Sequence, residues 1–154
     1  KIENYLLNKT KVSLEEISIL TNLSENYNVS ELIDNCLAKN PYKTAHILNE
    51  NSYSHEDCML VLRTLLIKLK RLYHLRNTAD TTSIDKAIAE HKPPIFWKEK
   101  NIVKKQLSVW KSNELVNQIS TVNDIEVIIK KNIGNSFLII SDFLLASSSS
   151  NNST

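Results

Sequence analysis

The residues of this chain that could do chemistry include two adjacent pairs of carboxylates and four single histidines. Glu15 with Glu16, and Glu56 with Asp57, have the spacing of an acid/base pair. Both pairs fall in predicted first helical turns, where the helix dipole favours negative charge without any catalytic role. No histidine has a Ser or Cys partner at a recognisable spacing, so no nucleophilic site is predicted. The histidines are His46, His55, His74 and His91.

Zinc is the only metal that the residue types suggest. Cys36, His46, His55 and Cys58 are possible ligands, and His55 precedes Cys58 by about one helical turn. Their spacing matches no compact structural-zinc pattern, and the two cysteines form no CxxC pair. We therefore expect buried cysteines that act as small hydrophobic residues. No metal and no cofactor are expected.

The usual catalytic motifs are missing as well. The chain contains no phosphate-binding loop, no GxSxG and no HExxH. We therefore expect a chain without enzyme activity of its own. A small helical enzyme whose site is assembled from dispersed residues stays open as an alternative.

Aromatic and basic side chains gather after the double proline Pro93-Pro94. Lysines beside an aromatic ring are typical of a nucleic-acid path, whereas aromatic residues beside stiff prolines also mark subunit contacts. A solvated helix face and core aromatic residues, among them Trp110, are the structural alternatives. The candidate partner-interface residues are Phe96, Trp97, Lys98, Lys100 and Phe143. The candidate basic face consists of Arg63, Lys70, Arg71, Lys104 and Lys105.

Composition favours an all-α helical bundle. The 154 residues include one glycine and three prolines, and sheets and phosphate loops both need more glycine. The net charge of +2 does not by itself indicate a nucleic-acid surface. No apolar run has the length of a membrane span, and the start lacks a Met and a secretory segment. We expect a cytoplasmic chain cut from a longer protein.

Helical periodicity and capping residues divide the chain into short helices around one long one. Ser54 with Asp57 begins the longest helix, Asn40-Pro41 begins an earlier one, and Ser83 a brief one. Ser112 is expected to cap a further long helix that stops at a left-handed Gly134. A last helix from residue 136 is expected to bury Phe137, Leu138, Ile140, Phe143 and Leu144, although its dense apolar run would also suit a strand. Residues 147–154 are expected to be a disordered tail.

Five ordered blocks resemble a known family. They are residues 31–36 (ELIDNC), 45–51, 62–76, the block PPIFWK at 93–98 with Gln106, Leu107 and Trp110 after it, and 115–130 with Asp124 or Glu126 and Lys130. In this order they resemble the C-terminal collar domain of the delta subunit of bacterial DNA polymerase III, a clamp-loader component. Residues 12–23 resemble the last helix of that family's AAA+ lid domain. The resemblance thus divides the chain into lid (1–28), collar (29–146) and tail (147–154).

The resemblance implies a non-catalytic role in DNA replication. A collar packs against the collars of the gamma or tau and delta-prime subunits and so holds the clamp-loader ring together, while polymerase activity resides in another subunit. The family's sliding-clamp contact lies in an N-terminal domain outside this chain, and DNA is reached through the complex. The runner-up reading is a helical nucleic-acid-binding module that uses the basic face.

Overall fold

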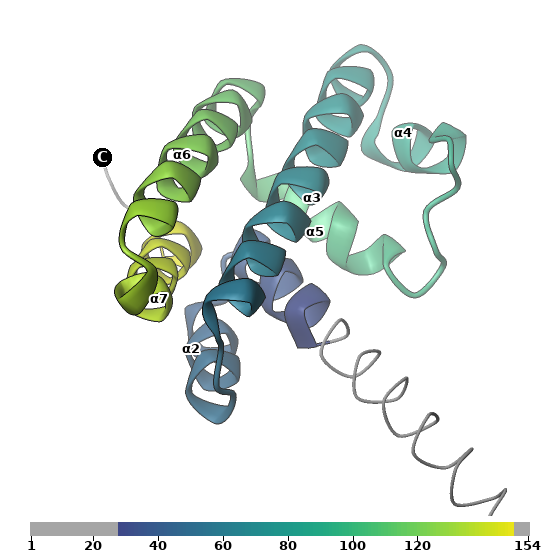
Figure 1. Ribbon diagram of the computed structural model, residues 1–154. Helices are drawn as coiled ribbons and strands as arrows, with labels where there is room; N and C mark the ends of the chain where they lie inside the picture. Colours follow the sequence, from purple (N-terminus) through teal and green to yellow (C-terminus); the bar gives the residue numbers. More distant parts are fainter. Residues whose placement is uncertain (1–27, 150–154) are drawn as a thin grey trace, which may run out of the picture.

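The fold of the chain is a helical bundle, seen in a computed structural model that describes residues 28–149 (Figure 1). Within those residues there is no β-strand, which confirms the all-α prediction. The elements are a helical segment at residues 28–37, α2 (Pro41–Glu50), α3 (His55–Thr81), α4 (Ile84–Glu90), α5 (Lys100–Val109), α6 (Ser112–Lys131), the 3₁₀ turn η1 (Ile133–Asn135) and α7 (Ser136–Ser148). The helices predicted before residue 28, with Glu15 and Glu16, lie outside the described residues, so the division into lid and collar stays a prediction.

Helix α3 is the centre of the bundle. It runs through the middle of the molecule and packs against α4, α5, α6 and α7 (Figure 1). Its 27 residues begin with the predicted capping box, in which Asp57 N donates to Ser54 Oγ (3.1 Å) and Ser54 N donates to Asp57 Oδ2 (2.9 Å). Its fully buried leucines include Leu65, Leu69 and Leu72. Burying each such side chain is worth about 1.5–3 kcal/mol, so this one helix organises the core.

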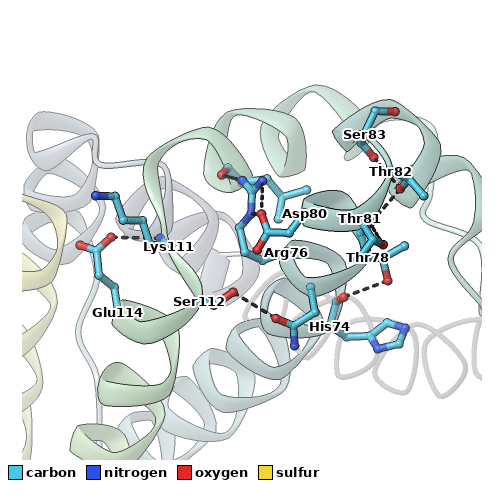
Figure 2. Close-up of polar contacts among 12 residues, drawn as sticks. His74, Arg76, Thr78, Asp80, Thr81, Thr82, Ser83, Lys111, Ser112 and Glu114 are labelled. Carbon is cyan, nitrogen blue, oxygen red and sulfur yellow. Dashed lines mark hydrogen bonds and ion pairs between the residues drawn. The ribbon is translucent and has the colours of Figure 1, made fainter.

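Two other predicted helix starts are confirmed, and one is wrong. The side chains of Asn40 and Ser83 accept hydrogen bonds from the backbone at the starts of α2 and α4. Ser112 was expected to cap α6, but the N-cap is Lys111, whose N–H donates to Glu114 Oε1 (3.0 Å; Figure 2). The Ser112 hydroxyl instead donates to Asn77 Oδ1 on α3 (3.1 Å) and ties the two helices together.

The glycine prediction is also wrong. Gly134 has no positive φ and lies in η1. Helix α6 ends at Lys131, and its C-cap is Asn132, whose side-chain amide donates to Ile128 O (2.8 Å). The left-handed residue is Lys39 (φ 61°), after the segment 28–37. A non-glycine residue is unfavourable there. The Lys39 ammonium compensates by donating to Ser147 O (2.9 Å) and lying 3.8 Å from the centre of a Trp110 ring.

The last helix differs from its prediction in two respects. It is a helix and not a strand, but it buries Ile140 and Leu144 while Phe137 and Leu138 remain exposed and Phe143 is partly buried. It also extends through Ser148, so the expected tail begins too early. Ser147 and Ser148 are helical and buried.

Polar contacts fix the C-terminal end of α3 against the end of α5 and the start of α6 (Figure 2). Arg76 donates through Nη1 to Leu107 O (2.7 Å) and through Nε to Asp80 Oδ1 (3.0 Å). The Trp110 indole, fully within the core, donates to Leu37 O (2.8 Å). The connection between α5 and α6 is therefore held by both α3 and the segment 28–37.

A buried ion pair inside the bundle is the main feature that the sequence analysis missed. The Lys68 ammonium, on α3, lies 2.6 Å from Asp34 Oδ1, and the two side chains are only 11% and 14% exposed. The ammonium also donates to Ser30 Oγ (2.7 Å). The pair joins α3 to the segment 28–37.

Removing one member of this pair should destabilise the fold. Lys68→Met leaves the Asp34 carboxylate buried without its cation, so we expect the free energy of unfolding to fall by about 3 kcal/mol in urea titrations. The double variant Lys68→Met/Asp34→Leu should recover most of that loss, because it buries no charge. A single variant as stable as the wild type would show that the pair contributes nothing.

Candidate functional site

The segment between α4 and α5 presents two aromatic side chains to solvent. Ile95 is buried and holds the segment in the core, while Phe96 and Trp97 are 55% and 69% exposed. Glu99 N donates to Phe96 O (2.8 Å) in the turn that leads into α5. The two rings are 5.9 Å apart, centre to centre. A turn anchored at both ends therefore holds an exposed aromatic pair, whereas Trp110 is a core residue.

Phe96 is part of the wall of a groove. The groove has a volume of about 570 Å³ and lies between the segment 28–37 and the start of α5. Its lining residues are Ser30, Glu31, Asp34, Asn35, Lys43, Phe96, Lys98, Glu99 and Ile102. Pockets of this size accept drug-sized molecules or protein side chains. The structure thus brings two of the predicted interface residues, Phe96 and Lys98, together in one concave site.

The three carboxylates of the groove all have cationic partners. Glu31 pairs with Lys43 (3.6 Å), Asp34 with Lys68 (2.6 Å) and Glu99 with Arg71 (3.6 Å).

The fourth cation near the groove, Lys98, is different. Within residues 28–149 it forms no ion pair, and its ammonium lies 5.4 Å from the centre of the Trp97 ring. The groove therefore combines an apolar wall with one positive charge that the described part of the fold does not neutralise.

The other predicted interface residues lie elsewhere. Lys100 begins α5 and is exposed, but does not line the groove. Phe143 borders a second hollow of about 400 Å³ between α6 and α7, which shares no residue with the first. The predicted interface is thus two separate places and not one surface.

The predicted basic face is divided by ion pairs. Arg71 is engaged by Glu99, and Lys104 pairs with Asp85 of α4 (2.9 Å). Arg63, Lys70 and Lys105 are exposed. Two of the five positive charges are therefore already balanced within the fold, which weakens any common field that could attract phosphates.

Several other titratable groups have structural partners. His46 lies 3.1 Å from Glu50, and His55 Nδ1 lies 2.6 Å from Ser136 Oγ. The Cys36 thiol donates to Leu144 O (3.4 Å), and Cys58 is buried as a free thiol. Among residues 28–149 no three potential ligands lie close enough to hold a metal ion.

Most of the groove could not be found from the sequence. Ser30, Asp34, Lys43 and Ile102 come from three helices and meet only through the tertiary packing of the bundle. Each is unremarkable in its own helix. The only sequence signal was the aromatic and basic run beside the double proline.

Comparison with known proteins adds no assignment, since no protein-family model, curated protein or solved structure matches this chain. In the described part of the chain, no helix is both long and apolar enough to cross a bilayer.

Burial should protect both thiols and make stability depend on pH. Burial raises the pKa of Cys36 from 9.0 to about 12, and burial with the nearby Asp57 charge raises that of Cys58 to about 11. Unfolding lets both thiols ionise at their ordinary pKa. The thiols should therefore leave the free energy of unfolding unchanged well below pH 9 and lower it as the pH rises from about 9 toward 12.

Two measurements check this expectation. At pH 8 a chromogenic disulfide reagent should modify the folded protein only as fast as it unfolds, and both thiols at once in urea. In Cys36→Ala/Cys58→Ala the loss of stability at alkaline pH should be smaller. Rapid labelling of the native protein would contradict the burial of the thiols.

Proposed function

We propose that this chain is a non-catalytic assembly module, the collar region of a DNA polymerase III delta subunit in a bacterial clamp loader. It works in the cytoplasm by packing against the collars of the gamma or tau and delta-prime subunits. The order of the sequence blocks supports the family, and the exposed Phe96–Trp97 pair beside the groove is the observation that carries the binding role.

The aromatic pair favours protein binding for energetic reasons. Interfaces derive most of their affinity from a few large side chains, often aromatic, that become desolvated near the centre of the contact. Phe96 and Trp97 are more than half exposed although each could bury a large area. They are held by a structured turn, so little conformational entropy is lost on binding.

The polar groups support the same reading. His46, His55 and Cys36 have structural partners, Cys58 is buried, and His91 Nδ1 lies 2.8 Å from Pro93 O, with the His91 ring 5.7 Å from that of His74. Two cations of the basic face are also neutralised by the fold. These features favour a partner protein over a substrate or a nucleic acid.

Truncating the aromatic pair should weaken assembly. When the chain is mixed with the collar region of a gamma or delta-prime subunit from the same organism, light scattering should show a heteromeric complex. Phe96→Ala/Trp97→Ala should lower the affinity at least about tenfold, because hot-spot truncations cost about 2 kcal/mol or more. Ile67→Ala on α3 is the matched control, since Ile67 is 68% exposed but does not line the groove. Equal losses in both variants, or no wild-type complex, would contradict the proposal.

DNA binding should be weak and independent of the basic face. In anisotropy titrations with a duplex oligonucleotide at physiological salt, we expect a Kd no tighter than the nonspecific range of about 10⁻⁴–10⁻⁶ M. Arg63→Glu/Lys70→Glu should change it little. Tight binding that this variant abolishes, with a steep salt dependence, would favour the nucleic-acid-binding reading instead.

A further inference from the structure

The charge balance of the groove indicates the chemistry of its occupant. Its carboxylates, Glu31, Asp34 and Glu99, are paired with Lys43, Lys68 and Arg71 at 2.6–3.6 Å. Lys98 has no such partner within residues 28–149 and lines the same groove. A ligand that placed one carboxylate beside Lys98 would neutralise this lysine. It would not be repelled by an unpaired carboxylate, because the three carboxylates of the groove already have cationic partners.

The apolar part of the groove lies next to this charge. Phe96 is 55% exposed and Ile102 is partly buried against the core, and both line the groove. Contact with both would remove from water apolar area that the isolated chain leaves exposed, which is favourable. The occupant therefore needs both an apolar group and a carboxylate.

The walls of the groove are fixed before anything binds. Asp34 is held by Lys68, and its carbonyl accepts a hydrogen bond from Gln106 Nε2 (2.9 Å). The turn from Phe96 to Glu99 is closed by a backbone hydrogen bond of 2.8 Å. A preorganised site loses little entropy when it is filled.

We propose that this groove receives a segment of a partner subunit that inserts an apolar side chain against Phe96 and Ile102 and places a carboxylate on Lys98. The inference rests on the proposed assembly function and specifies the partner's chemistry. A nucleic-acid backbone fits less well, because its successive phosphates would lie against three carboxylates. A protein segment, by contrast, can bring a single carboxylate and place it on the Lys98 ammonium.

The first test compares two lysines that lie two residues apart. Lys98→Glu places a negative charge in the groove, whereas Lys100→Glu makes the same change outside the lining. In calorimetry of the chain with a gamma or delta-prime collar region, Lys98→Glu should weaken binding at least about tenfold and Lys100→Glu by less than about threefold. Equal thermal unfolding temperatures would confirm that both variants fold.

The outcomes separate this inference from the proposed function. If the wild-type complex forms and Lys98→Glu binds as tightly as the wild type, the inference is overturned while the assembly role stands. If no wild-type complex forms, the assembly role and the partner assigned here both fail. If Lys98→Glu instead abolishes salt-dependent binding of a single-stranded oligonucleotide, the groove serves nucleic acid and the proposal is overturned.

A second test needs no partner and reads the groove chemistry directly. In amide NMR spectra, 3-phenylpropionate should shift the signals of Asn35, Lys98 and Ile102, and the neutral analogue 3-phenyl-1-propanol should shift them less at the same concentration. Lys98→Glu should remove the preference for the acid. Equal effects of both compounds, or shifts confined to other regions, would overturn the assignment of an apolar anchor with a carboxylate.

Discussion

The apolar stripe of α3 is the constraint on which the rest of the structure depends. A 27-residue helix with ten buried positions is not stable alone in water, so other helices must cover it along its whole length. α4 and α5 pack along one side, and α6 and α7 along the other (Figure 1). The candidate groove is a product of this arrangement, because the segment 28–37 and α5, which form its walls, are both held against α3.

The buried pair between Lys68 and Asp34 gives this packing a specific register. Apolar contacts tolerate sliding, whereas an ammonium 2.6 Å from a carboxylate does not. The pair fixes the segment 28–37 against α3, and Gln106 of α5 donates to the backbone of the same Asp34. One interaction inside the fold therefore positions both walls of the site at its surface.

The sequence predicted the local structure well and the tertiary relations poorly. Helix starts at Asn40, Ser54 and Ser83 follow from side-chain caps, which act over three residues and can be read directly. The burial of the charged Lys68 was not predicted, although this residue lies three residues after Leu65 and four before Leu72, on the buried face. Phe96 and Trp97 were interface candidates with a core position as the alternative, and their exposure excludes the core position. The sequence left both open because a turn has no periodicity that separates core from surface. The prediction of a left-handed Gly134 was wrong for a related reason. The side chain of Asn132 caps the end of α6, where a left-handed glycine was expected.

We propose that a partner subunit covers the groove and its aromatic rim. Hydrogen–deuterium exchange on the chain, alone and with a saturating gamma or delta-prime collar region, tests it most directly. We expect slower exchange in the partner's presence at residues 30–35 and 96–102, with little change at the exposed η1 turn. Unchanged exchange at both groove segments in a complex that has formed would contradict it.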